Sequence, residues 1–209
     1  MRIVTIAREM GALDSAQESA LCQAIGLRAV HRDTLEERFR KLGTDPEHIE
    51  RFDERKPRLM DSFLGRPNVY WETLQTVILQ EAVQGNVAIV GRGANFLLGD
   101  IVDCFRLRFV APPEIRAERV ARQLNCTVPQ AMDCIRKSDR ERIGFCYYFY
   151  GKKWQDANAY DLTINTEKVS LFSLEEIVPK FISLKDISAQ DEAKLRDREL
   201  QQFIRYTLL

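Results

Sequence analysis

The sequence predicts an α/β fold in which helices cover both faces of a mainly parallel sheet. Short apolar runs alternate along the chain with longer segments in which apolar residues recur at helical spacing. One of these runs, residues 87–90, is apolar at every position, as is typical of a strand buried on both faces of a parallel sheet. The 209 residues, 45% of them hydrophobic, can bury one sizeable core. We therefore expect a doubly wound, three-layer domain.

The first strands and helices are predicted close to the N-terminus. Residues 1–7 form an apolar run, and the amphipathic segment that follows reaches Gly26, a residue suited to end a helix. Residues 27–31 form a short extended piece. Asp33 is suited to cap the next helix, whose apolar residues share one face.

The alternation of helix and strand continues through the second half of the chain. Prolines that follow one strand suit the first turn of a helix, and a serine followed three residues later by glutamate is typical of a helix start. The elements predicted beyond residue 42 are a helix over 68–84, strands over 87–90, 104–111 and 162–165, a helix after Pro112-Pro113, and a helix opened by a capping box at 173–176.

Composition excludes several classes of protein. Lysine plus arginine equals aspartate plus glutamate at 31 each, so the overall charge gives no support to nucleic-acid binding. The five cysteines form no C-x-x-C pair and only two histidines are present, which argues against a zinc site, and we expect no metal ligands. No apolar run approaches the ~18 residues of a membrane helix. We therefore expect a cytoplasmic protein without membrane association.

The segment after the first strand has the layout of a phosphate-binding site. A strand, a turn with Gly11 and a helix N-terminus bring backbone N–H groups and the positive helix end together, which makes Gly11 and Ser15 candidate phosphate ligands. The usual loop, G-x-x-x-x-G-K-[ST], also supplies lysine for the outer phosphates and a hydroxyl for magnesium. Here no lysine occurs before Lys41.

Arg92 is the strongest candidate for binding an anion. It follows the buried strand directly and lies between Gly91 and Gly93, so it is expected at the carboxyl edge of the sheet, where open α/β folds bind ligands. The two glycines allow backbone and guanidinium to approach an anion closely. The alternative is a tight turn whose arginine pairs with a nearby carboxylate.

Two further segments are rich in arginine. Arg116, Arg119 and Arg122 recur at a spacing of three and line one helix face, which could contact a base and phosphates or could be a solvated face. Arg140 and Arg142 lie in a dense basic stretch with aromatic residues after it. Such arginines can neutralise transferred phosphate as a site closes, or can bind single-stranded nucleic acid with the aromatics, although the neutral overall charge argues against nucleic acid.

Five segments in this order resemble the cytidylate kinase-like family of P-loop nucleotide kinases, and the resemblance covers residues 1 to about 182. They are IVTIAREMG at 3–11, VAIVGRGA at 87–94, VAPPEIRAER at 110–119, IRKSDRER at 135–142 and YDLTINT at 160–166.

The resemblance implies a P-loop kinase fold over residues 1–182, with an acceptor-binding helical excursion at 43–66, a helical lid at 136–154 and a C-terminal helical extension at 183–209. It implies a small-molecule nucleotide as ligand, with ATP and Mg²⁺ as cofactors of an active member. The site residues that it implies are Arg92 in the acceptor pocket, Arg116 and Arg119 beside the donor, and Arg140 and Arg142 in the lid.

The chain departs from the family pattern at the phosphate loop. Family members usually carry a loop similar to Gly-Ser-Gly-Gly-Arg-Glu, whereas this chain has GALDSA at 11–16. Asp14 would repel a phosphate, and His31 stands where an aspartate is usual. Two hypotheses follow: a phosphotransferase acting from ATP on a nucleoside monophosphate or related acceptor, and a catalytically degenerate homologue that senses a nucleotide or other anion or binds a partner.

The C-terminal segment is predicted to be a docked helix. Leu200, Phe203, Ile204, Thr207 and Leu208 form an apolar stripe at helical spacing. The stripe is expected to pack on the domain or, as the alternative, on a second subunit to form a homodimer.

Overall fold

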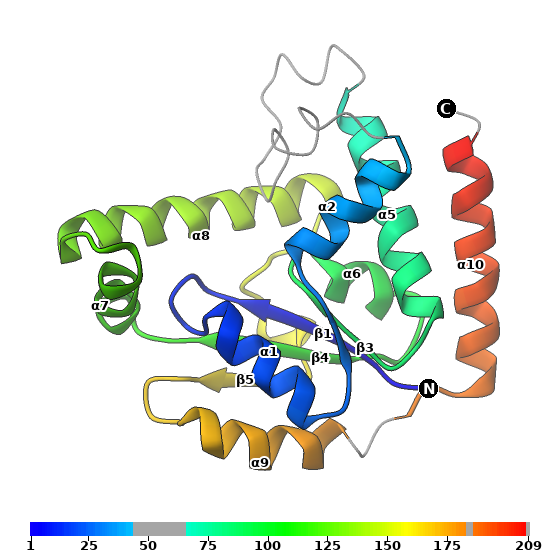
Figure 1. Ribbon diagram of the computed structural model, residues 1–209. Coiled ribbons are helices and arrows are strands. Elements are labelled where there is room, and N and C mark those ends of the chain that lie inside the picture. Colours follow the sequence, from blue (N-terminus) through cyan, green and yellow to red (C-terminus); the bar gives the residue numbers. More distant parts are fainter. Residues whose placement is uncertain (44–65, 183–185, 208–209) are drawn as a thin grey trace.

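The computed structural model describes residues 1–43, 66–182 and 186–207 and has the predicted α/β architecture (Figure 1). Its sheet has five strands, all parallel, in the order β2-β3-β1-β4-β5. This confirms the predicted doubly wound parallel sheet. The strands are β1 (Ile3–Arg8), β2 (Arg28–Val30), β3 (Val87–Val90), β4 (Phe105–Val110) and β5 (Leu162–Asn165).

The helices lie on both faces of the sheet, because side chains along each strand alternate between the two faces. Val87 and Ile89 belong to a core shared with α2, α5 and α6, whereas Ala88 and Val90 belong to a core shared with α1 and α9. The helices are α1 (Ser15–Ala24), α2 (Arg32–Lys41), α5 (Arg66–Val83), α6 (Ala94–Gly99), α7 (Pro113–Leu124), α8 (Val128–Tyr150), α9 (Leu171–Ile182) and α10 (Ala189–Thr207), with a 3-10 turn at Ala157–Ala159.

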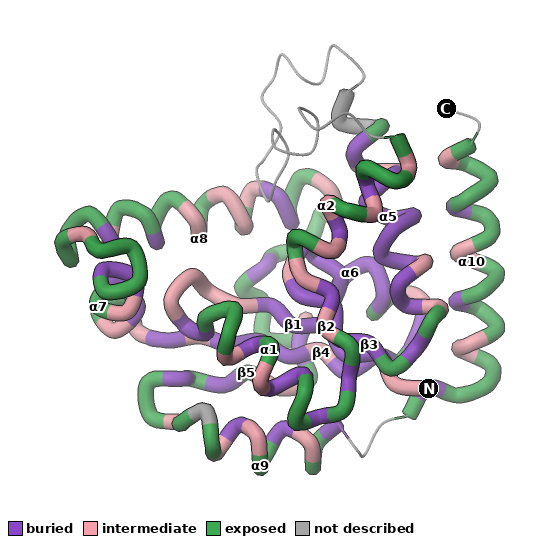
Figure 2. Tube along the Cα trace, in the orientation of Figure 1, coloured by how far each residue is buried: buried purple, intermediate pink, exposed green. Residues whose placement is uncertain are grey.

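The central strands are the most deeply buried part of the chain (Figure 2). All four residues of β3 are buried, as the continuous apolar run predicts. Among the described residues, no helix combines the length and the apolar character needed to span a bilayer.

Helices α7 and α8 form an arm that extends away from the sheet (Figure 1). They pack on each other through a small core of their own, which includes Ala117, Val120 and Ile135. Thr127 caps α8 by accepting a hydrogen bond from the backbone N–H of Gln130. The predicted lid at 136–154 therefore corresponds to the second part of a longer helix and the segment that follows it.

Two local predictions are corrected by the structure, and one helix is added. Asp33 is not a cap, because α2 begins at Arg32 and its N-cap is His31. The capping box at residues 173–176 is also wrong, because α9 begins earlier and the Ser170 hydroxyl accepts the Ser173 N–H at 3.1 Å. Helix α6 directly after Gly93 was not expected from the sequence. Its short length gives little periodicity to detect.

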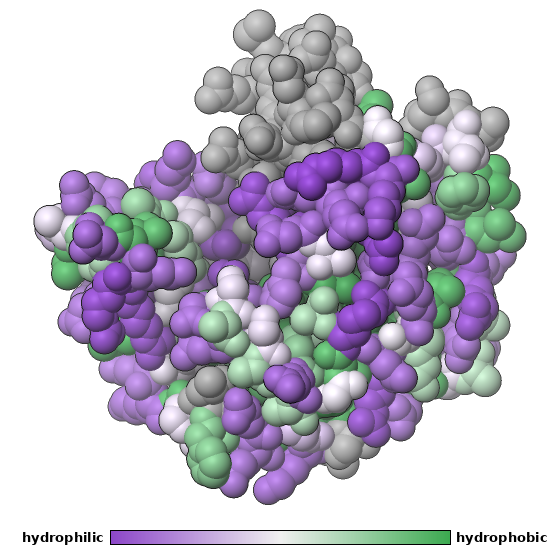
Figure 3. All heavy atoms as spheres, viewed as in Figure 1, coloured by the Kyte–Doolittle hydropathy of each residue, from purple (hydrophilic) through white to green (hydrophobic). Residues whose placement is uncertain are grey.

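The C-terminal segment forms the predicted helix, but it docks by a different face. Helix α10 lies along α5 and buries Leu195 and Gln202, whose amide donates to Glu72. Leu200, Phe203 and Ile204 remain 40–56% exposed. Figure 3 shows hydrophobic side chains gathered towards the C-terminal end of α10, at the upper right.

The division of the chain into a core, an excursion, a lid and an extension stays a prediction. The helical excursion expected at 43–66 lies, apart from its two end residues, outside the described part of the chain.

Candidate functional site

A cavity of about 480 Å³ opens at the carboxyl edge of the sheet. Ala7 and Val90 line it at the ends of β1 and β3, the two adjacent strands. Ile6 pairs with Val90, Arg8 is the last residue of β1, and Arg92 lies in the turn just after β3, so both arginines are at the same edge of the sheet. This is the edge at which open α/β sheets bind ligands.

Arg92 lies in this cavity and is only 6% exposed. Its backbone adopts a left-handed conformation with φ 56°, between Gly91 at φ 78° and Gly93 at φ 66°. Three consecutive positive φ angles are possible here because glycine tolerates them on both sides. The Tyr150 hydroxyl donates a 2.6 Å hydrogen bond to the Arg92 carbonyl, which ties this turn to the end of α8.

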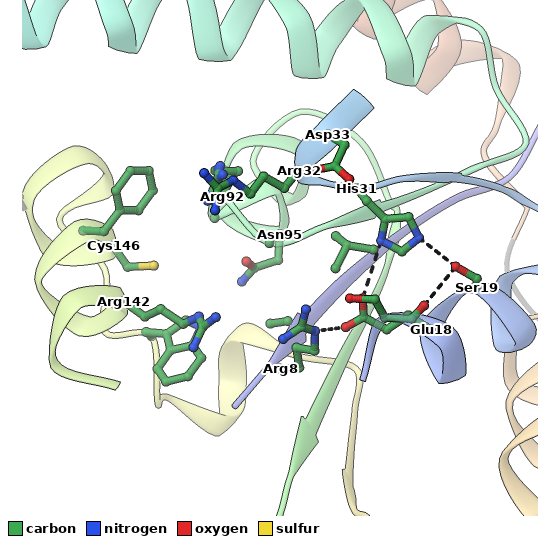
Figure 4. Close-up of a pocket in the computed structure, with 17 residues that line it drawn as sticks. Arg8, Glu18, Ser19, His31, Arg32, Asp33, Arg92, Asn95, Arg142 and Cys146 are labelled. Carbon is green, nitrogen blue, oxygen red and sulfur yellow. Dashed lines mark hydrogen bonds and ion pairs between the residues drawn. The ribbon is translucent and has the colours of Figure 1, made fainter. Parts of the chain in front are cut away.

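Glu18 carries a fully buried carboxylate on the α1 side of the cavity. It forms an ion pair with Arg8, and its Oε2 lies 3.5 Å from Nδ1 of His31 (Figure 4). The other ring nitrogen of His31 lies 3.3 Å from the Ser19 hydroxyl. Burial of the ring and the nearby Arg8 charge lower the pKa of His31 below its ordinary value of 6.5, while Asp33 acts in the opposite direction. We therefore expect a neutral imidazole at pH 7.

The opposite wall comes from α8 and the segment after it. Arg142 reaches the cavity from α8 together with Phe145 and Cys146, and Trp154 lies beside them. In Figure 4 the guanidinium groups of Arg8, Arg92 and Arg142 point into the same space. Aromatic side chains therefore line the cavity beside the arginines.

The charges that line the cavity favour an anionic ligand. Four arginines line it, and the only carboxylates that do so among the described residues are Glu18 and Asp33. Asn95, a residue only 5% exposed, also lines the cavity, with its side-chain amide close to Tyr160. Its amide could also hydrogen-bond a ligand in the cavity.

The structure places Arg116 away from this cavity. Its guanidinium donates to both carboxylate oxygens of Asp139, at 3.1 and 2.8 Å, and its Nε lies 3.4 Å from Glu9. It also donates to the carbonyl of Ala111 at 3.1 Å. Arg116 is 5% exposed, and through these contacts it connects the loop after β1 to α7 and α8.

The guanidinium of Arg119 is also hydrogen-bonded to acceptors within the protein. It donates to the carbonyls of Gly11 and Ala12, at 3.3 and 3.2 Å, and to the hydroxyl and carbonyl of Thr166, at 2.9 and 2.7 Å. The Thr166 hydroxyl donates to Ala12 as well. Hydrogen bonds to the carbonyl groups of Gly11 and Ala12 therefore hold the loop after β1 in place.

Gly11 contacts α7 rather than the cavity. Its φ is 82°, and a Cβ at this position would lie 2.7 Å from the Arg116 carbonyl and 3.0 Å from a methyl group of Val120. Close packing against α7 therefore accounts for glycine here.

The Asp14 carboxylate caps helix α1 at the point where a phosphate-binding loop would hold phosphate. It accepts the N–H of Gln17 at 2.8 Å, and the Gln17 side chain accepts the N–H of Asp14 at 3.0 Å. This reciprocal pair satisfies two backbone donors and places a negative charge at the positive helix end.

Of the predicted site residues, the structure brings Ser15, Arg92 and Arg142 to the cavity. Gly11, Arg116 and Arg119 lie outside its lining, and Arg140 is exposed on α8 and also lies outside it. Sequence reasoning missed the cavity residues Arg8, Glu18, Arg32 and Asn95. The position of Arg8 at the end of the central strand could have indicated its role, since carboxyl ends of parallel strands share one edge.

In the parts of the chain that the structure describes, no group of three or more histidine, cysteine or carboxylate side chains is arranged to hold a metal ion.

Comparison with known proteins relates the chain to nucleotide kinases. A sequence model of the cytidylate kinase-like family matches residues 3–168. A cytidylate kinase of Pyrococcus horikoshii is 25% identical over 172 residues, which cover 80% of this chain and 81% of that protein. A cytidylate kinase of Staphylothermus marinus is 33% identical over 104 residues, 49% of this chain and 58% of the relative, so the chain spans just over half the length of that protein.

Solved structures share the fold. An uncharacterised protein of Eubacterium ventriosum has a TM-score of 0.68 at 17% identity, with 88% of this chain and all of that chain covered. A shikimate kinase of Bacteroides thetaiotaomicron has a TM-score of 0.51 at 15% identity, with 88% and 97% covered.

Proposed function

Because the chain belongs to the cytidylate kinase-like family, we propose that it is a catalytically degenerate member that binds a nucleoside monophosphate or a related small anion in the cavity at the carboxyl edge of the sheet. In this proposal Arg92 and Arg142 contact the anionic group, Asn95 donates a hydrogen bond and Trp154 supplies an apolar surface. The protein senses or presents the ligand instead of phosphorylating it.

The observation that carries the proposal is the cap on α1. Asp14 provides the acceptor that a phosphate would otherwise provide at this helix end. A phosphate brought within ~4 Å of this carboxylate would be repelled by several kcal/mol at an effective dielectric near 20. The carbonyls of Gly11 and Ala12 are bound by Arg119, so the loop is anchored to α7.

Members of the family in general use ATP and Mg²⁺. ATP would bring its outer phosphates to the loop after β1, and Mg²⁺ would bind there through a hydroxyl. The residues of this loop do not fit that role, because it lacks the lysine and places Asp14 and the buried Leu13 where family members usually have glycines. We therefore derive no phosphoryl-transfer step through ATP.

A kinase activity is the second candidate, and one observation favours it. Arg92 and Arg142 reach the cavity from opposite walls, the arrangement that neutralises charge on a transferred phosphoryl group. Arg140, which is exposed on α8, could join them only if α8 moved. Arg116 and Arg119 would have to exchange their protein acceptors for a nucleotide.

Thermal-shift measurements with CMP, other monophosphates and ATP, each with and without magnesium, test the proposal. We expect a monophosphate to raise the melting temperature without magnesium and ATP to have no effect. A ligand at 100 times its Kd stabilises by ~2.7 kcal/mol. The Arg92→Ala variant should lose the shift, and the matched control Arg122→Ala, an exposed arginine on α7, should keep it.

A coupled ADP-release assay with the same monophosphates separates the two candidates. We expect no turnover. Turnover of ~1–100 per second, the usual range of kinases, would contradict the proposal of a catalytically degenerate protein and show that the protein is a kinase. A full thermal shift in Arg92→Ala would contradict the ligand assignment under both candidates.

We further propose that the protein acts in the cytoplasm and associates as a homodimer through the exposed apolar stripe of α10, formed by Leu200, Phe203 and Ile204.

A further inference from the structure

The ring of His31 lies between two hydrogen-bond acceptors in the lining of the arginine-lined cavity (Figure 4). Its Nδ1 lies 3.5 Å from the carboxylate of Glu18, and its Nε2 lies 3.3 Å from the hydroxyl oxygen of Ser19. That hydroxyl donates its own proton to the Ser15 carbonyl at 2.9 Å, so its oxygen is left to accept. A neutral ring carries one N–H and satisfies one of the two acceptors, whereas a protonated ring satisfies both.

The Glu18 carboxylate is shared between Arg8 and His31. One of its oxygens pairs with Arg8 and the other faces the ring. The carboxylate is fully buried, so it needs a cation beside it. In Figure 4 the guanidinium of Arg8 also points into the space that Arg92 and Arg142 face. An anion in this space would therefore attract Arg8 and weaken its pairing with Glu18.

The groups around the ring act on its protonation in opposite directions. Burial and the Arg8 charge lower the pKa of His31, and Asp33 raises it. Besides these groups and Glu18, the charged or titratable side chains that line the cavity in the described part of the chain are Arg32, Arg92, Arg142 and Cys146. Because the arginines of the lining outnumber its carboxylates, an anion in the cavity would offset net positive charge and make protonation of the ring more favourable.

We propose that the arginine-lined cavity binds its anion together with one proton, which His31 accepts. The anion attracts Arg8, and the protonated ring donates to Glu18, so the buried carboxylate keeps a cation beside it. The proton comes from the solvent, and the only covalent bond formed is the second N–H of the ring. The inference rests on the anion binding proposed above. Because such coupling is reciprocal, a lower pH tightens binding of the anion.

Calorimetric titration with sulfate measures the pH dependence of anion binding. Sulfate is a suitable probe because its own charge does not change between pH 6 and pH 8. In the parent protein we expect sulfate to bind about fivefold or more tightly at pH 6 than at pH 8. In His31→Gln the Kd should be the same at both pH values. The matched control is His48→Gln, which removes the other histidine of the chain and should keep the pH dependence.

Magnetic resonance of the histidine rings tests the same coupling in the parent protein. The chain has two histidines, so either variant assigns both ring signals. Saturating sulfate should raise the pKa of His31, and saturating CMP should do the same. The ring signal reports protonation of His31 directly, so titration of the CMP phosphate does not obscure it. This measurement decides the proposal even if His31→Gln fails to fold.

Three results would overturn the inference. If sulfate and CMP bind but leave the pKa of His31 unchanged, the coupling is wrong and the anion binding proposed above still stands. If the pH dependence is lost in His48→Gln and kept in His31→Gln, the proton has been assigned to the wrong residue. If neither sulfate nor CMP binds at any pH, both the inference and the proposed function are contradicted.

Discussion

The hydroxyl of Tyr150 donates a hydrogen bond to the carbonyl of Arg92 and so fixes the turn that carries the cavity arginine. The ring covers Gly93 so closely that a Cβ there would lie 2.3 Å from it. Burial, with contributions from Cys146 and Tyr70, raises the pKa of Tyr150 well above its ordinary value, although Arg92 opposes this. The hydroxyl is therefore protonated, and can act as a donor, at neutral pH.

The Tyr150→Phe variant should weaken anion binding in the arginine-lined cavity while leaving the fold intact. The ring would still cover Gly93, but the left-handed backbone of Arg92 would lose its tie to α8. We expect a Kd for the monophosphate about tenfold higher, measured by calorimetry. Unchanged affinity in this variant would show that the hydrogen bond does not position Arg92.

Two substitutions at Asp14 separate its cap from its charge. Asp14→Ala should lower the free energy of unfolding by about 1 kcal/mol because the cap is lost, whereas Asp14→Asn should be nearly neutral since asparagine caps equally well. Both are measured by urea denaturation. Neither variant should gain an ATP-dependent thermal shift, because Arg119 still holds the loop carbonyls. If ATP did raise the melting temperature of the Asp14→Asn variant, the negative charge of Asp14 alone would account for the exclusion of ATP.

Gly11→Ala should destabilise the protein more than Gly26→Ala. Both glycines have positive φ, so both substitutions cost about 1 kcal/mol in backbone strain. Only at Gly11 would the new methyl group meet a backbone atom, the Arg116 carbonyl, since nothing lies within 4 Å of the corresponding position at Gly26. Denaturation midpoints of the two variants provide the comparison, and equal losses would contradict the packing role of Gly11.

His31 should make the protein less stable as the pH falls through 6.5. Its pKa is lowered in the folded state, so the unfolded chain takes up the proton first, and protonation favours unfolding. The loss is complete only once the pH lies below the folded pKa. The free energy of unfolding should therefore fall less between pH 7.5 and 5 in His31→Gln than in the parent. Parallel profiles for the two proteins would show that His31 does not contribute.

The apolar stripe on α10 should control the oligomeric state. Replacing Leu200, Phe203 and Ile204 by serine should convert a dimer to a monomer in light scattering, with little change in melting temperature because these side chains are exposed. Leu195→Ala is the contrasting variant: it removes a fully buried side chain and should lower the melting temperature instead. A parent protein that is already monomeric would contradict the dimer.

Strongly patterned segments were predicted well from sequence. The strands Val87–Val90 and Leu162–Asn165 have the predicted bounds, and Phe105–Val110 lies one residue inside its prediction at each end. Helix starts were less predictable, as Asp33 and Ser173 show, because several polar residues near a start can serve as the cap and only the backbone conformation selects one.

The sequence by itself determined the alternation of strand and helix, and thereby the sheet and the position of Arg92 at its carboxyl edge. These features depend on local periodicity and on the shared direction of parallel strands. Tertiary structure alone decided which arginines face the cavity. Arg92 and Arg116 are both buried beyond strand ends, yet only Arg116 meets Asp139 and Glu9, which lie far from it in sequence. A guanidinium pairs with a carboxylate that the fold brings close to it. The spacing of residues along the sequence does not predict the distance in space between an arginine and a carboxylate far from it in the chain.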